Sequence, residues 1–150
     1  LLCMGNGGSS CDAAHLAVEF GHPVSTGRPA LPAINLSADI AMLTAVGNDV
    51  GYDQVFQRQV IALGQEGDAL FGLSTSGNSA NLISAFKAAR ERGMLCIALL
   101  GGDGGKIAER SELDHCLVVS TTNIHRIQET HVACYHILWD LVHTLMAARR

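Results

Sequence analysis

The sequence predicts an α/β fold of three layers, in which helices cover both faces of a doubly wound, flavodoxin-like sheet of five parallel strands. Five short apolar runs alternate with six helical patterns along the 150 residues, and such alternation is typical of parallel sheets. The runs are almost wholly apolar, as strands buried on both faces are. Turns rich in glycine or hydroxyl groups follow two of the runs at their carboxyl ends, where ligands of such sheets bind.

The first strand, residues 1–4, leads into a glycine-rich turn at Gly5–Ser10 and a helical pattern over residues 11–20. The turn lacks the G-x-G-x-x-G spacing of dinucleotide sites. A glycine turn that opens a helix can still bind a phosphate or a sugar hydroxyl, with Ser9 as a donor. The alternative is a tight turn that needs glycine only for its backbone angles. The residues of this turn leave both possibilities open.

All three prolines lie in the loop that follows the first helix, and a second strand is predicted at residues 33–36. Helical patterns then cover residues 39–46 and 53–63, the second of which ends at a glycine. Asn48 and Asp49 stand at the break between these two helices. We expect their side chains to face a cleft or solvent.

The stretch from Ala69 to Ala85 carries the strongest functional signal. Residues 69–73 form an apolar strand, and an amphipathic helix begins near Leu82. Between them lie four hydroxyl side chains around Gly77, namely Ser74, Thr75, Ser76 and Ser79. Unpaired N–H groups and the helix dipole make such a position an anion site. A simple N-cap would need one hydroxyl rather than four, so the stretch favours phosphate binding.

The second half of the chain completes the fold. Strands are predicted at residues 94–100 and 114–119, a short helix at 106–109 and a long helix at 124–148. No internal repeat and no second domain interrupts this order. We therefore expect residues 1–150 to form a single domain.

Composition excludes several classes of function. A net charge of −4 argues against a nucleic-acid-binding surface, and no apolar run approaches membrane-spanning length. The five cysteines are an odd number without Cys-x-x-Cys pairs, which indicates reduced thiols. We expect a cytoplasmic protein with neither a nucleic-acid nor a membrane partner. The chain begins at Leu1 rather than Met, so a leader or first helix is expected to precede it.

His15 and Glu19 are four residues apart in the first helix. This spacing puts both on one helix face, one turn apart. Such a pair can bind one metal ion, or it can be an ordinary surface pair, and the spacing alone favours the surface pair.

Five short motifs then combine: G-N-G-G-S at Gly5–Ser9, H-x-x-x-E at His15–Glu19, G-N-D at Gly47–Asp49, S-T-S-G-N-S at Ser74–Ser79 and R-I-Q-E-x-H at Arg126–His131. In this combination they resemble the sugar isomerase (SIS) domain family and, within it, the phosphoheptose isomerases. Those enzymes convert sedoheptulose 7-phosphate to D-glycero-D-manno-heptose 7-phosphate for bacterial surface polysaccharide. The resemblance covers nearly the whole chain, but not the extra helix with which family members begin.

The resemblance implies a role for each matching residue. The phosphate would be held by Ser9, Ser74, Thr75, Ser76 and Ser79. The substrate would also touch Asn6, Gly7, Glu19, Asn48, Asp49 and Gln128. One zinc ion per subunit would be bound by His15, Glu19, Gln128 and His136, and protons would be moved by Glu19 and His136. The resemblance further implies a homotetramer with its sites at subunit contacts.

The chemistry explains why these residue types are needed. Aldose–ketose isomerisation removes a proton from the carbon next to a carbonyl and returns one to the neighbouring carbon. It needs a base, an acid and stabilisation of the enediolate oxygens, and zinc can supply that stabilisation as a Lewis acid. A carboxylate is the usual base at carbon, which favours Glu19 as the base and His136 as the proton donor.

The last helix raises a geometric difficulty. His136 follows Gln128 by eight residues, which is about 12 Å along the helix axis with a rotation of roughly 80°. One ion reaches both only if the side chains lean together or come from different subunits. His131 is a competing ligand, and its alternative role is in a subunit contact; the alternative for His136 is the core. His125 stands where heptose isomerases tend to carry Asp, which leaves the exact sugar open.

Two non-catalytic functions are the alternatives. A replication-initiator-associating protein has a similar fold without parts of the Glu/His set, and a sugar-phosphate sensor would need only the hydroxyl turns. This chain has both Glu19 and His136, which favours the enzyme. The last helix is apolar over most of its circumference, at Val132, Tyr135, Leu138, Trp139, Val142 and Leu145. Burial on more than one side, and hence a partner subunit, follows from this pattern.

Overall fold

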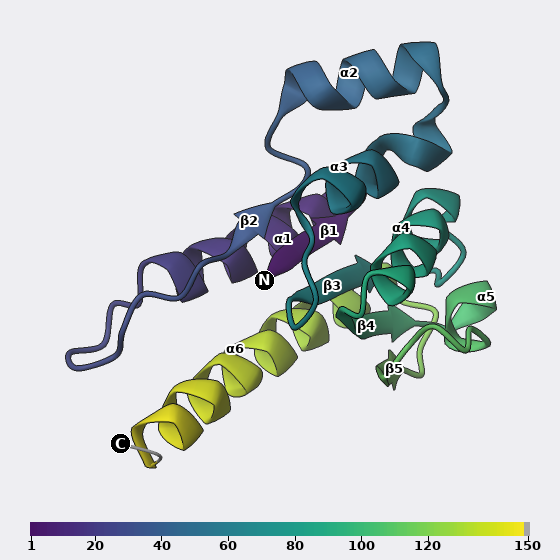
Figure 1. Ribbon diagram of the computed structural model, residues 1–150. Helices are drawn as coiled ribbons and strands as arrows, with labels where there is room; N and C mark the ends of the chain where they lie inside the picture. Colours follow the sequence, from purple (N-terminus) through teal and green to yellow (C-terminus); the bar gives the residue numbers. More distant parts are fainter. Residues whose placement is uncertain (149–150) are drawn as a thin grey trace.

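The computed structural model describes residues 1–148 and confirms the predicted α/β architecture (Figure 1). Its elements are β1 (Leu2–Gly5), α1 (Gly8–Gly21), β2 (Ile34–Asn35), α2 (Ile40–Asp49), a 3-10 helix (Tyr52–Gln54), α3 (Val55–Leu63), β3 (Ala69–Ser74), α4 (Ala80–Glu91), β4 (Leu95–Gly101), α5 (Gly105–Ala108), β5 (His115–Val119) and α6 (Ile124–Ala148). The five strands form one parallel sheet in the order β2-β1-β3-β4-β5. Within these residues, none of the helices is long and apolar enough to cross a membrane.

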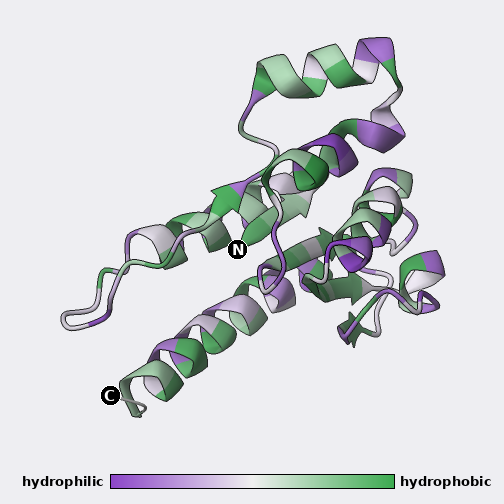
Figure 2. Ribbon diagram, viewed as in Figure 1, coloured by the Kyte–Doolittle hydropathy of each residue, from purple (hydrophilic) through white to green (hydrophobic). Residues whose placement is uncertain are grey.

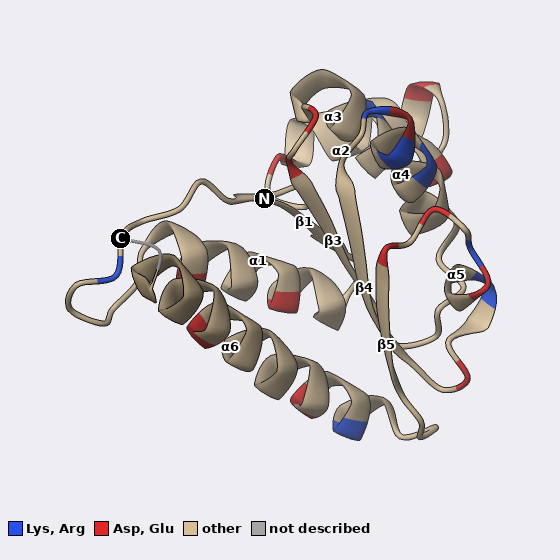
Figure 3. Ribbon diagram, turned by 60° about the horizontal axis from the view of Figure 1, so that its bottom comes forward, with Lys and Arg blue, Asp and Glu red and all other residues tan. Residues whose placement is uncertain are grey.

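Helices cover both faces of the sheet, and each face has its own apolar core. On one face α1 and α6 lie side by side (Figure 3), and their core includes Leu16, Phe71 and Tyr135. On the other face α3 and α4 pack against the sheet, and their core includes Leu70 of β3 and Phe86 of α4. The apolar sequences of the three central strands β1, β3 and β4 are thus largely buried between the two layers of helices. Their removal from water, at about 25 cal/mol per Å² of apolar surface, is the main force that holds the layers together.

The direction of winding reverses between β1 and β3. From β1 the chain passes through α1 to β2, and from β3 it passes through α4 to β4 on the opposite side. Because α1 and α4 cover opposite faces, the turns that open them separate and leave a crevice, which is where open α/β sheets bind ligands. Gly5 pairs with Leu73 across the two strands. The glycine-rich turn and the hydroxyl turn are therefore neighbours.

Gly77 allows the hydroxyl turn to pack tightly against the start of α5. Its φ is +64°, and a Cβ at this position would lie 1.9 Å from the carbonyl oxygen of Gly104. The Gly77 carbonyl accepts the N–H of Ile107 (2.8 Å), and the side chain of Asn78 accepts the N–H of Lys106 (3.1 Å). The hydroxyl turn is thus fixed by the protein itself, before any ligand binds.

Several predicted boundaries differ from the structure. The second strand has only two paired residues, and α2 runs on to Asp49, so Asn48 and Asp49 end a helix instead of following one. The prediction that every strand is buried is wrong for β5, in which Leu117 is 45% and Val118 is 37% exposed. An edge strand has a neighbour on one side only. An apolar sequence therefore does not by itself show that helices cover both of its faces.

Candidate active site

The hydroxyl turn after β3 holds its shape through its own side chains. Ser74 is buried; its Oγ accepts the N–H of Gly77 (3.1 Å) and lies 3.2 Å from the Oγ of Ser79. The exposed Ser76 accepts the N–H of Asn78 (3.2 Å). Ser79 occupies the N-cap position of α4 but makes no capping hydrogen bond in the described structure. The simple capping role is therefore not supported, and the start of α4 remains suited to an anion.

The glycine-rich turn after β1 is fixed by an amide pair that sequence analysis missed. Asn6 exchanges two hydrogen bonds of 2.9 Å with Asn81 of α4, and its Oδ1 also accepts a bond from the Tyr52 hydroxyl (3.2 Å). Asn81 is 2% exposed. The available signal was a polar residue on the apolar face of the predicted helix. These bonds tie the glycine turn to the start of α4, so both turns face one crevice.

Gly7 and Gly8 open helix α1. Gly7 is the N-cap, with a φ of 55° that favours glycine. A Cβ on Gly8 would lie 2.2 Å from Nε2 of Gln128, so this glycine lets the Gln128 amide approach the turn. Ser9 is 3% exposed, which makes its hydroxyl less accessible to a ligand than the hydroxyls after β3.

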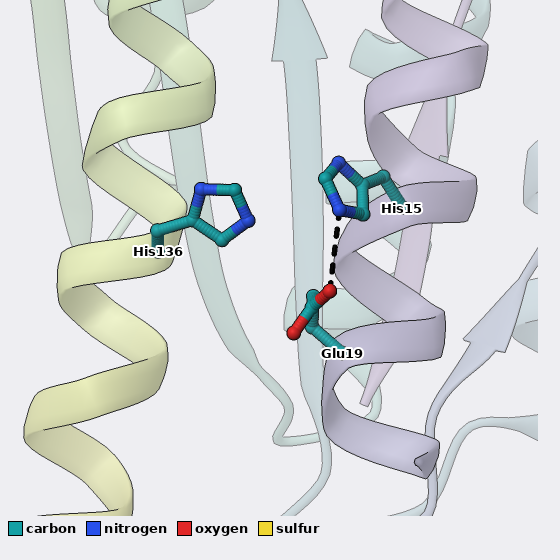
Figure 4. Close-up of side chains that lie close together, drawn as sticks. All are labelled: His15, Glu19 and His136. Atoms are coloured by element: carbon teal, nitrogen blue, oxygen red, sulfur yellow. Dashed lines mark hydrogen bonds and ion pairs between the residues drawn. The ribbon is translucent and has the colours of Figure 1, made fainter. Parts of the chain in front are cut away.

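His15 and Glu19 of α1 meet His136 of α6 (Figure 4). One ligand atom of each residue lies within 4.8 Å of the other two. His15 Nε2 is 3.2 Å from Glu19 Oε1, and the two imidazole centroids are 5.0 Å apart. Two imidazoles and a carboxylate are a common zinc ligand set, with bonds of ~2.0–2.2 Å, and three protein ligands leave a position open for substrate. The structure thus brings together three of the four expected ligands.

Two aromatic residues of α6 pack behind this group. The fully buried Tyr135 has its hydroxyl 2.7 Å from His15 Nδ1, and Trp139 donates its indole N–H to the backbone carbonyl of Glu19 (2.7 Å). Burial raises the pKa of Tyr135 to about 12, and the charges of Asp12 and Glu19 add to this effect. Sequence analysis assigned both aromatics to packing alone. Their polar atoms were the signal, because buried Tyr and Trp usually have hydrogen-bond partners.

Gln128 and His131 do not join the group. His131 is fully buried, and its Nε2–H donates to the carbonyl oxygen of Leu100 on β4 (3.0 Å); burial also lowers its pKa. It is therefore neither a ligand beside His136 nor a histidine of a subunit contact, and both expectations for it were wrong. Gln128 lies against Gly8, about 12 Å along α6 from His136.

The remaining expected residues are exposed and lie outside the group of His15, Glu19 and His136. Asn48 and Asp49 are exposed, as predicted, and the Asn48 amide donates to the Asp49 carboxylate (2.7 Å). Tyr52, just after them, connects this segment to the glycine turn through Asn6. His125 is exposed in the first turn of α6.

Known proteins are similar in sequence to this chain over most of its length. Residues 1–101 match the family model described as SIS domain. A phosphoheptose isomerase from Pelobacter propionicus is 53% identical over 148 residues, which are 99% of this chain and 77% of that protein. A phosphoheptose isomerase from Geobacter sulfurreducens is 51% identical over 142 residues, which are 95% of this chain and 74% of that protein.

Solved structures of phosphoheptose isomerases are similar to this chain in fold and in sequence. The phosphoheptose isomerase from Neisseria gonorrhoeae superposes with a TM-score of 0.86 at 49% identity, covering 94% of this chain and 74% of its own. A phosphoheptose isomerase from Francisella tularensis gives a TM-score of 0.88 at 41% identity, covering 95% and 75%. The likeness therefore extends through sequence as well as fold.

Proposed function

This chain belongs to the SIS domain family and, within it, to the phosphoheptose isomerases, and we propose that it interconverts sedoheptulose 7-phosphate and D-glycero-D-manno-heptose 7-phosphate for bacterial surface polysaccharide. The observation that supports catalysis over binding alone is the meeting of His15, Glu19 and His136. A sugar-phosphate sensor or a replication-initiator-associating protein would need the turns without this group. The enzyme is therefore the better match.

Glu19 and His136 divide the proton transfers between them. Glu19 takes the proton from C1 of the ketose and later returns it to C2, while His136 gives a proton to the C2 oxygen so that the developing enediolate becomes an enediol. His136 then takes the proton from O1, which completes the aldehyde and returns both side chains to their starting protonation states. Both side chains point into the space between α1 and α6 (Figure 4), and carboxylates and imidazoles are side chains that serve as general acids and bases.

The phosphate binds at the hydroxyl turn. Ser76 is exposed and Thr75 is half-buried, while Ser74 and Ser79 shape the turn through their mutual contact. Ser9 contributes from beneath the glycine turn. The sugar hydroxyls bind to the amide, carboxylate and backbone groups that the resemblance implies. These groups belong to Asn6, Gly7, Asn48, Asp49 and Gln128.

His15, Glu19 and His136 would hold a zinc ion at this site. Zinc supplies Lewis-acid stabilisation of the enediolate oxygens when it is bound. Glu19 would serve as a ligand and as the base in turn, because a zinc-bound carboxylate would be less basic. The distance along α6 keeps Gln128 from the ion that His136 of the same chain binds, so a Gln128 ligand comes from a second copy at a subunit contact.

A coupled assay with sedoheptulose 7-phosphate tests this function. We expect formation of the aldose phosphate, loss of turnover after treatment with a chelator and recovery when zinc is restored. Sugar-phosphate binding without turnover, even with zinc supplied, would favour the sensor instead. The five free cysteines support a reducing, cytoplasmic location for the enzyme.

A homotetramer is expected in solution, with α6 and β5 in its contacts. Ile137 and Leu145 are 60% and 61% exposed, and hydrophobic segments recur along α6 in Figure 2. Beside them β4, β5 and α6 line an apolar cavity of about 440 Å³. Apolar surface of this extent is usually covered by another protein surface.

Light scattering at micromolar concentration should give the mass of four chains. Ile137→Asp should shift the mass toward smaller species, because a charge desolvated in an interface is unfavourable. The matched change Val24→Asp, in a loop where the side chain is 80% exposed, should leave the mass unchanged. A parent chain that is monomeric at this concentration would contradict the proposed assembly.

A further inference from the structure

Tyr135 makes a polar contact that its packing does not require. Its fully buried ring packs edge-on against both imidazoles, with centroids 5.5 Å from His15 and 4.8 Å from His136. A phenylalanine would fill the same space. The hydroxyl nevertheless lies 2.7 Å from His15 Nδ1, a good hydrogen-bond distance. This contact acts on the nitrogen of His15 that faces away from the carboxylate.

The two ring nitrogens of His15 have different partners. Nδ1 faces Tyr135, and Nε2 faces Glu19 Oε1 at 3.2 Å (Figure 4). A neutral imidazole has one N–H, so without a cation Nε2–H donates to Glu19 and Nδ1 accepts the phenol hydrogen. A cation needs the lone pair of Nε2, and the ring proton must then be on Nδ1. A phenol oxygen can accept a hydrogen bond from that N–H as well as donate one.

We propose that Tyr135 is a positioning residue: it aims His15 Nε2 at the cation and accepts the Nδ1–H hydrogen bond when the cation is bound. This inference rests on the metal site of the proposed function. Histidines that bind metals usually donate their other N–H to an outer acceptor, which fixes the tautomer. A carbonyl or carboxylate can only accept, whereas a phenol remains hydrogen-bonded to His15 with and without the cation.

Asp12 is the candidate for the second acceptor that this exchange needs. When Nδ1–H donates to the Tyr135 oxygen, the phenol hydrogen must turn elsewhere. Oδ2 of Asp12 is buried and has no hydrogen-bond partner among the described residues. Asp12 lies one turn before His15 on α1, and its charge reaches both Tyr135 and His15. No hydrogen bond joins Asp12 and Tyr135 among the described residues, so a small side-chain movement would be needed to bring the phenol hydrogen to this carboxylate.

Tyr135→Phe tests the proposal because it removes the hydroxyl and keeps the ring. Zinc affinity, measured by competition with a chelator, should fall about 10–100-fold, the usual loss when an outer partner of a metal ligand is removed. Tyr52→Phe is the matched control, since it removes a hydroxyl that contacts Asn6 instead of the metal group. Its zinc affinity should equal that of the parent.

Thermal unfolding separates positioning from a purely structural role. Zinc that binds the folded state raises the Tm of a protein by an amount that grows with the logarithm of its affinity. A structural role for the hydroxyl would lower Tm equally with and without zinc. Positioning should instead shrink the zinc-induced increase in Tm. Parent-like zinc affinity in Tyr135→Phe overturns the inference while the metal site stands, whereas a parent chain that binds no zinc overturns both.

Nitrogen NMR of the parent chain supplies a test that needs no variant. In the zinc-loaded protein, long-range proton–nitrogen spectra should identify Nδ1 of His15 as the protonated nitrogen and Nε2 as the metal-bound one. Coordination through Nδ1 would leave Tyr135 no role in aiming Nε2, and would overturn the proposal even if Tyr135→Phe failed to fold.

Discussion

Glu19→Gln should lower turnover by about 10²–10⁴-fold, the loss typical of a missing general base. Gln keeps the size and hydrogen bonding of Glu but lacks its charge and basicity. The KM for the sugar phosphate should change little, because the hydroxyl turn that holds the phosphate belongs to β3 and α4 and not to α1. Steady-state kinetics at saturating zinc measure both constants and separate lost basicity from lost metal.

His136→Gln should cause a similar loss, and the two losses should not add, because residues that act as one unit are strongly non-additive. Glu129→Gln is the matched control: Glu129 is exposed on α6 and pairs with Arg126 at 2.6 Å. It should retain the kinetics of the parent. Parent rates in both Glu19→Gln and His136→Gln would show that the acid–base pair is wrong.

Thr75→Ala combined with Ser76→Ala should raise the KM for the sugar phosphate while the fold survives. A hydrogen bond to a charged group contributes about 1.5–3 kcal/mol, so each lost hydroxyl should weaken binding tenfold or more. Neither hydroxyl is fully buried: Ser76 is exposed and Thr75 is half-buried. An unchanged KM in the double variant would show that the phosphate does not bind at this turn.

Two further variants sharpen that result. Ser111→Ala removes an exposed hydroxyl before β5 and should leave the KM unchanged. Ser74→Ala should lower the Tm as well as raise the KM, because Ser74 accepts the N–H of Gly77 and is buried. A hydroxyl that only binds the phosphate and a hydroxyl that also supports the turn are thus distinguished by how much the loss of each lowers the Tm.

The sequence by itself determined the layers of the fold and the residue types of the site. Apolar runs such as residues 69–73 became buried strands because a parallel strand covered on both faces has no place for polar side chains. The i, i+4 spacing of His15 and Glu19 put both on one face of α1, as the helical period requires. The motifs that these residues form also led to the family that the relatives bear out.

Only the tertiary structure decided which distant residues meet. Helical spacing fixes the face on which a residue lies, but the packing of α6 on α1 decides that His136 reaches His15, that Gln128 instead reaches Gly8 and that His131 turns into the sheet. The Tyr135–His15 contact joins residues 120 positions apart. Such contacts depend on where each helix packs on the twisted sheet, and a short sequence pattern does not specify that position. The exposure of β5 has the same origin, because burial is set by neighbouring elements and not by the apolar character of the strand.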